Sequence, residues 1–197
     1  MRKVLVSLIT LAGLAIAASA SAAEPFTAGK IQAGGGLNYG IFMGDDDQDP
    51  PNPYGLGLGL GAGYTLGFGL YLGGEFNYFF GSTEETSGVE TSMNIMQFGA
   101  NVGYDLGLSP QFVLRPMLGI GSATGYTEST GGGLSFEADE SGLMIPIGAQ
   151  ALYSMGSWYL SGQARYAIFN ITTETGGTET DWNGNGLILG VGAGAAF

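Results

Sequence analysis

The sequence predicts an all-β protein: an eight-stranded antiparallel up-and-down β-barrel that crosses a membrane with its strands. Three observations indicate this fold. Eight segments alternate apolar side chains with small or polar ones, which is the period-two pattern of a strand. Each segment has about ten or more residues, the length that a tilted transmembrane strand needs. The connections are short and long in turn, as in bacterial barrels.

The first 23 residues have the composition of a secretory signal peptide. Arg2 and Lys3 precede an apolar run at 4–18, and small residues follow at 19–23. The apolar run is shorter than the roughly 20 residues that a helix needs to span a bilayer. We therefore expect residues 1–23 to be removed and residues 24–197 to form one barrel domain.

The expected strands follow one another along the rest of the chain. They span 30–43, 54–64, 69–81, 93–104, 112–122, 143–153, 158–170 and 186–197. Short turns are expected at 65–69, 106–111 and 154–157, and longer polar connections at 44–53, 82–92, 123–141 and 172–185. The even number of strands places both termini at the end with the short turns, which is the periplasmic end of a bacterial barrel. Aromatic residues gather toward the strand ends as two girdles, with Tyr54 in the girdle near the long connections.

Two prolines interrupt the pattern. Pro116 and Pro146 fall inside expected strands, although proline has no N–H to donate and every strand of a closed barrel has a neighbour on both sides. Since they lie nearly symmetrically about the connection at 123–141, we expect them to face one another across a β-bulge.

The last twelve residues carry the alternation in its most regular form. Leucine, valine and alanine share one face, glycine and alanine share most of the other, and the chain ends on Phe197. This strand resembles the terminal strand of the outer-membrane β-barrel proteins of Gram-negative bacteria, and the chain resembles the small OmpA- and OmpX-like barrels. The resemblance implies an outer-membrane location, contact with lipid and lipopolysaccharide, and recognition of Phe197 by the barrel-assembly machinery. We expect a monomer.

The inward faces predict a filled lumen. Glycines of the last, first and second strands form a bare wall, and larger side chains face it from the other strands. The inward polar residues expected to form a charge and amide network are Glu75, Asn77, Asn101, Arg115, Gln150, Gln163 and Arg165. Buried charges need partners, so we expect salt bridges that close the lumen. The alternative is the charged constriction of a conducting pore.

Most acidic residues lie in or beside the long connections. Two of these connections carry half of a calcium-loop motif, formed by Asp45, Asp47 and Asp49 and by Asp181, Asn183 and Asn185. Both lack the glutamate that completes the motif. We expect weak association with Ca²⁺ or Mg²⁺ there, but no defined metal site and no cofactor.

Composition excludes several classes of function. After residue 23, three basic residues stand against 17 acidic ones, a net charge of −14, which excludes nucleic-acid binding. The chain has no cysteine, so disulfides are excluded, and no histidine, which excludes Ser-His-Asp and Cys-His catalysis. We therefore expect that the protein is not an enzyme.

The expected function is a non-enzymatic, structural or surface-interaction role in the outer membrane, with acidic extracellular loops. One alternative is a narrow passive channel for small solutes. A second is a soluble lipocalin-like barrel that binds a hydrophobic ligand.

Overall fold

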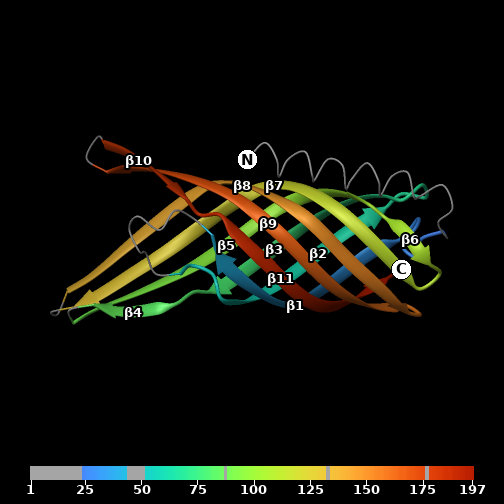
Figure 1. Ribbon diagram of the computed structural model, residues 1–197, viewed down its shortest axis with the longest axis horizontal. Coiled ribbons are helices and arrows are strands. Elements are labelled where there is room, and N and C mark those ends of the chain that lie inside the picture. The colour runs from blue at the N-terminus through green and yellow to red at the C-terminus, as the bar shows by residue number, and fades with distance from the viewer. Residues whose placement is uncertain (1–23, 44–51, 87, 132–133, 176–177) are drawn as a thin grey trace.

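Eight long strands form a closed antiparallel barrel in the computed structural model (Figure 1). The structure describes residues 24–43, 52–86, 88–131, 134–175 and 178–197, and the side chains of these except at 86, 134–140 and 170–183. The long strands are β1 (Ile31–Phe42), β2 (Leu56–Thr65), β3 (Leu70–Phe80), β5 (Val89–Tyr104), β7 (Phe112–Gly131), β8 (Leu134–Met155), β9 (Trp158–Thr175) and β11 (Gly186–Ala196). Three short strands accompany them: β4 (Thr83–Thr86), β6 (Leu106–Ser109) and β10 (Thr178–Asn183).

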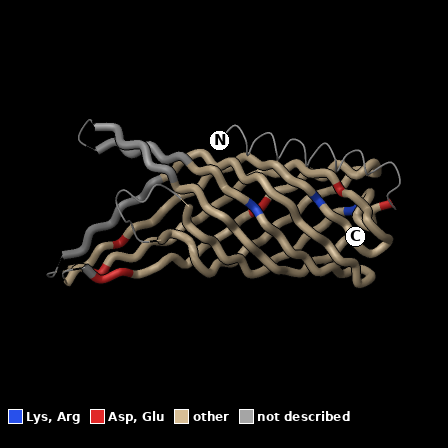
Figure 2. The backbone as a smooth tube through the Cα atoms, in the orientation of Figure 1, with Lys and Arg blue, Asp and Glu red and all other residues tan. Residues whose placement is uncertain are grey.

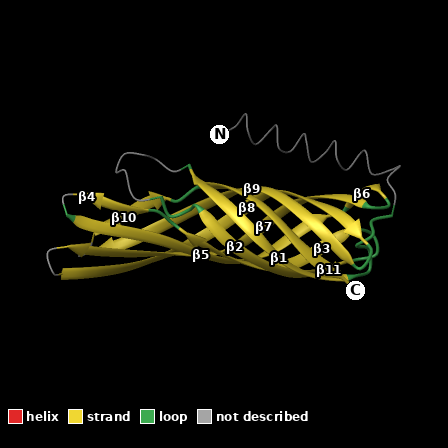
Figure 3. Cartoon of the chain, turned by 90° about the horizontal axis from the view of Figure 1, so that it is seen from below, coloured by secondary structure: helices red, strands yellow, loops and turns green. Residues whose placement is uncertain are grey.

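Each long strand pairs with its neighbours in sequence, and the ring closes where β1 pairs with β11. The order around the barrel is β1, β2, β3, β5, β7, β8, β9 and β11. Residues 24–30, Phe197 and the short turns lie at one end, named here the terminal end, and the β4 and β10 hairpins lie at the other, the hairpin end (Figure 3). The predicted eight-stranded barrel is confirmed.

The alternation of side chains is also confirmed. The residues predicted to face outward are mostly exposed, and the large ones include Ile31, Leu37, Leu58, Leu60, Leu72, Phe98, Leu118, Leu160 and Val191. Their inward neighbours Gln32, Asn38, Asn77 and Gln97 are buried. An apolar outer wall around a polar interior is the arrangement that lipid requires of a barrel. No helix among the described residues is long and apolar enough to cross a membrane.

Several strands are longer than predicted. The pairing of β7 with β8 runs on to Gly131 and Leu134, and β9 continues to Thr175, so most of the expected connections at 123–141 and 172–185 are strand. These extensions are rich in Thr, which favours strands, but they lack a regular apolar face. Apolar alternation marks only the part of a strand that lies in lipid. A prediction based on it therefore does not find these extensions.

The predicted proline bulge is wrong. Pro116 lies opposite Ala149, and Pro146 lies opposite Ala167 on the other side of β8, so the two prolines do not face one another. The β7–β8 pairing is interrupted at 119–120 but resumes in the same register. A Cβ built at Gly119 would lie 2.8 Å from Cγ of Pro146. The glycine therefore makes room for the proline ring. The β7–β8 ladder loses hydrogen bonds here, but neither strand contains the extra residue of a β-bulge.

Candidate functional site in the barrel lumen

Aromatic rings that lie against glycines fill part of the lumen. A Cβ built at Gly34 would lie 3.0 Å from Oη of Tyr159, and one built at Gly63 would lie 2.5 Å from Oη of Tyr71. Both glycines belong to the predicted bare wall, on β1 and β2. Large side chains from β3 and β9, the strands that flank this wall, occupy the space that it leaves, as expected from close packing.

Arg115 crosses the lumen near the terminal end. It projects from β7 and is buried to 2% exposure. Its Nε lies 2.5 Å from Oδ1 of Asp105 and its Nη2 lies 2.8 Å from Oδ2, while Nη2 also donates to Gln32 on β1 at 2.7 Å. Nη1 donates to Gln150 on β8 at 3.2 Å, and the guanidinium carbon lies 3.7 Å from the ring centre of Tyr71. Because β7 and β1 stand opposite one another in the ring, these bonds form a strut across the barrel.

The segment before β1 closes the terminal end over this strut. Thr27 is fully buried and its hydroxyl donates to Asp105, which also accepts a bond of 3.0 Å from Thr65. Phe26 lies 6.5 Å from Tyr159, ring centre to ring centre, and packs on a small buried cluster of Val113, Leu152, Tyr159 and Ala196. Asp105 is thus held by an arginine and two hydroxyls, the partners that a buried carboxylate needs.

A second strut lies nearer the middle of the barrel. Arg165 on β9 forms a salt bridge with Glu75 on β3, and its Nη2 donates to Gln163 at 2.5 Å. Gln163 donates to Asn38 at 2.8 Å, and Asn38 donates to Asn77 at 2.8 Å. Since β9 and β3 also stand opposite one another, the second strut joins a different pair of strands from the first. Figure 2 shows basic positions within the barrel, and acidic positions both within the barrel and at the hairpin end.

A polar cavity of about 80 Å³ lies between the struts and the glycine wall, with Arg115, Arg165 and Asn101 in its lining. It has room for several waters, since about 10–15 Å³ of such space holds one. Nε of Arg165 has no hydrogen-bond partner among the described residues. A water molecule in the cavity can therefore accept a hydrogen bond from this N–H group. The cavity therefore suits internal hydration.

The structure divides the predicted network into two groups. Arg115 and Gln150 belong to the first strut, Glu75, Asn77, Gln163 and Arg165 belong to the second, and Asn101 lines the cavity between them. The predicted network did not include Gln32, Thr27, Thr65, Tyr71 and Asp105, although Tyr71 and Asp105 were expected to face inward. The alternation already turns Gln32 and Tyr71 inward and could have found them. Asp105 lies between two strands, where alternation gives no direction.

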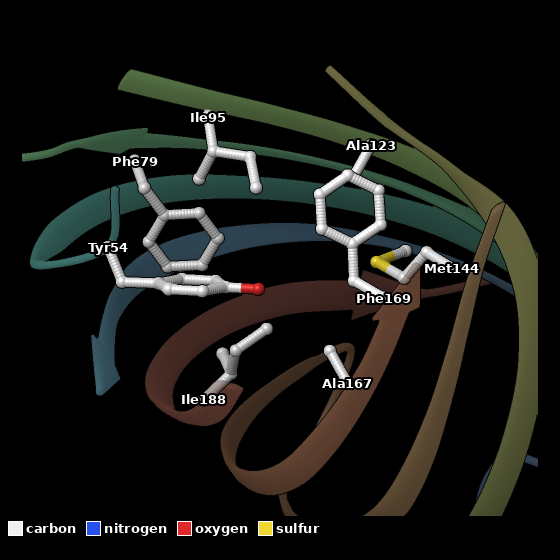
Figure 4. Packing of buried hydrophobic residues seen from close by; sticks show 8 residues of the cluster. All are labelled: Tyr54, Phe79, Ile95, Ala123, Met144, Ala167, Phe169 and Ile188. Carbon is white, nitrogen blue, oxygen red and sulfur yellow. The ribbon is translucent and has the colours of Figure 1, made fainter. Parts of the chain in front are cut away.

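An apolar cluster closes the hairpin end. Tyr54 is its centre, at 1% exposure, and is surrounded by buried residues (Figure 4). The prediction that Tyr54 belongs to an outer girdle is wrong. Gly55 has a φ of 129°, a conformation that L side chains rarely adopt, and this turn directs Tyr54 into the lumen.

The candidate cation residues are mostly beyond what the structure describes. Asp45, Asp47 and Asp49 fall outside the described residues, as do the side chains of Asp181 and Asn183. Oδ1 of Asn185 accepts a bond of 3.1 Å from the backbone N–H of Phe169. Within the described residues, no group of three or more Asp and Glu is placed to hold a metal ion.

Phe197 lies at the seam of the barrel. Its backbone N–H donates to Ile31 at 2.9 Å, its carbonyl accepts from Ile31 at 2.8 Å, and its side chain is 70% exposed. An exposed aromatic at the closing pair of strands is consistent with the predicted assembly signal, which stays a prediction.

Comparison with protein families decides the class. Residues 8–197 match the family described as outer membrane protein beta-barrel domain. The chain belongs to this family. Its location is therefore the bacterial outer membrane, and its apolar outer wall faces lipid.

Solved structures show the same fold. Ail, the attachment invasion locus protein of Yersinia pestis, is 15% identical, with a TM-score of 0.55 over 86% of this chain and 99% of that one. Neisserial surface protein A is 18% identical, with a TM-score of 0.54 over 85% and 96%. A major outer membrane protein from Thermus thermophilus is 12% identical, with a TM-score of 0.59 over 85% and 98%. No curated protein sequence matches the chain.

Proposed function

We propose that this protein is a non-enzymatic surface-interaction protein whose hairpin end faces the outside of the cell. The observation that carries the proposal is an open sheet edge. Strands β4, β5, β7 and β8 pair beyond the barrel, but β8 pairs with β9 only from Gly142 onward. Beyond that point β9 continues to pair on its other side, with β10 in the register of the β9–β11 ladder, and the two arms stand apart in Figure 1.

This leaves the outer edge of β8 at 134–141 without a neighbouring strand in the described part of the chain. Unpaired N–H and C=O groups along an edge are a template for the addition of a partner strand. Natural proteins usually protect such edges. An edge kept open at the tip of a projecting sheet therefore favours a role in recognition.

The charge of this end favours a basic partner. Glu84, Glu85, Glu90 and Glu128 are exposed on the projecting sheet. Glu85 lies directly opposite Glu90, an arrangement that raises the local negative potential. A structure of Ail contains the heparin analogue sucrose octasulfate, a polyanion. The carboxylates here would repel such a ligand, and we propose an extended basic segment of a protein instead. Weak Ca²⁺ or Mg²⁺ association would reduce repulsion from lipopolysaccharide.

The filled lumen favours this role over a narrow passive channel, because two struts and an apolar cluster occupy its cross-section. We further propose that residues 1–23 are removed as a leader, that residues 24–197 form the mature barrel with both termini in the periplasm, that Phe197 serves as the assembly signal, and that the protein is a monomer.

Hydrogen–deuterium exchange with a synthetic peptide that alternates lysine and threonine tests the surface role. We expect the peptide to slow exchange at 134–141 of β8 and to leave β1 unchanged. Replacement of Glu84, Glu85, Glu90 and Glu128 by Gln should abolish the effect, whereas Glu24→Gln at the opposite end should not. Binding without protection at 134–141 would show simple charge attraction and refute strand addition.

A further inference from the structure

Tyr54 occupies an apolar chamber built by most of the barrel wall. The residues that line it come from β3, β5, β7, β8, β9 and β11, and all are buried: Phe79, Ile95, Ala123, Met144, Ala167, Phe169 and Ile188. Figure 4 shows the phenol ring directed into the middle of this group. We name the space the Tyr54 chamber.

The chamber fits one flat ring. Cβ atoms built at Gly40 and Gly186 would lie 2.6 Å and 2.7 Å from atoms of the Tyr54 ring, so the ring lies on bare backbone of β1 and β11. Phe79 approaches it edge-on, with ring centres 5.4 Å apart and an interplanar angle of 70°. A side chain at either glycine would fill the place of the ring. The shape of the chamber therefore selects a planar aromatic group.

The polar end of the chamber has two hydrogen-bond acceptors, but the Tyr54 hydroxyl can donate to only one of them. The Tyr54 hydroxyl donates to the Gly184 carbonyl at 2.9 Å and accepts from Nε2 of Gln97 at 3.4 Å. Gln97 is fully buried, and its Oε1 has no hydrogen-bond partner among the described residues. A phenol has a single hydrogen to donate, which Gly184 takes. A buried acceptor left without a donor is costly.

We propose that the Tyr54 chamber is a binding site for a small aromatic molecule with two adjacent hydroxyl groups, and that Tyr54 fills the site when the molecule is absent. The first hydroxyl takes the position of the Tyr54 hydroxyl, between Gly184 and Nε2 of Gln97. The second supplies the donor that Oε1 of the same amide lacks. The ring replaces the Tyr54 ring on Gly40 and Gly186.

The chain provides a way for Tyr54 to leave. Strand alternation alone would place Tyr54 on the outer wall, and the left-handed Gly55 is what turns it inward. A rotation at Gly55 therefore exchanges the two positions. In the wild-type protein a ligand competes with a tethered tyrosine, which lowers its apparent affinity.

Titration with catechol, phenol and toluene tests the proposal. The Tyr54→Ala protein has an empty chamber, and Tyr39→Ala is the matched control because Tyr39 lies on the outer wall at 54% exposure. Detergent takes up all three probes, so the difference in heat between the two variants is the readout. We expect Tyr54→Ala to bind catechol about tenfold more tightly than phenol, the effect of about one hydrogen bond, and toluene least. Gln97→Leu in the same background should remove the preference for catechol.

Equal binding by Tyr54→Ala and Tyr39→Ala would overturn the proposal, and so would a preference for catechol that survives Gln97→Leu. If Tyr54→Ala refolds poorly, the folded fraction on unheated gels is measured with each probe present during refolding. Catechol should then restore folding better than toluene, and failure to do so contradicts the proposal. Tyr54→Phe retains a competing ring but lacks the hydrogen bond to Gly184, so it should bind catechol more weakly than Tyr54→Ala and at least as tightly as wild type.

Discussion

Removal of the Arg115 side chain gives the sharpest test of how the lumen is held together. Arg115→Leu leaves the Asp105 carboxylate buried, with its side chain at 0% exposure and without its two arginine bonds. Breaking a buried ion pair from one side costs about 3–5 kcal/mol. Gln32 and Gln150 lose a donor as well. We therefore expect Arg115→Leu to lower the free energy of unfolding by roughly 4 kcal/mol, at the middle of that range.

Urea unfolding in lipid vesicles, followed by tryptophan fluorescence, measures the effect. Asp105→Leu should cost a similar amount, because it leaves the guanidinium unpaired. The double variant should cost well below the total of the two single losses, with a coupling of about 2 kcal/mol or more. Lys30→Met, which removes a positive charge from the same end but outside the strut, should be within about 0.5 kcal/mol of wild type. Additive losses for Arg115→Leu and Asp105→Leu would refute the strut.

Three further predictions concern the glycines and Tyr54. Gly34→Ala should destabilise the barrel by about 1–3 kcal/mol, because the new Cβ would lie 2.7 Å from the Ala193 carbonyl oxygen. Gly162→Ala should be tolerated, because the nearest atom to its Cβ lies 4.0 Å away. Urea unfolding compares the two variants. Gly55→Val places a branched residue at a φ of 129°, so it should cost about 1–3 kcal/mol and make Tyr54 more reactive to tetranitromethane, as mass spectrometry can show. Burial raises the pKa of Tyr54 above its ordinary value. The stability that the neutral, buried Tyr54 hydroxyl contributes is therefore complete below about pH 10 and is lost as the pH rises further. The free energy of unfolding of Tyr54→Phe should depend less steeply on pH between about 9 and 11.5 than that of wild type.

The outer wall of the barrel could be predicted from the sequence because lipid imposes a simple rule. Leu58 and Leu60 alternate with Gly57 and Gly59, the pattern of a strand whose apolar face lies toward lipid. Where the strands leave the lipid the rule no longer applies. The extensions of β7 and β8 therefore looked like loops, although they pair as strands.

The inward positions were predictable, but their partners were not. Alternation turns Arg115 and Arg165 inward, yet the stagger of strands around the barrel decides which residue each one meets. Asp105, the partner of Arg115, lies in the bend between β5 and β6 and has no periodic signal. Tyr54 was placed on the wrong face because Gly55 reverses the alternation. A Pro-Tyr-Gly sequence at a strand start is the signal for such a turn.

Planar-bilayer recording tests the central claim, that two struts and the Tyr54 chamber close the lumen, most directly. The wild-type protein, shown to be folded by its shifted migration on unheated gels, should give no discrete current steps. The combined Tyr54→Ala, Glu75→Ala, Arg165→Ala, Asp105→Ala and Arg115→Ala variant removes both struts and the apolar closure and should conduct. Reproducible single-channel steps from the folded wild-type protein would contradict the account and establish an open pore.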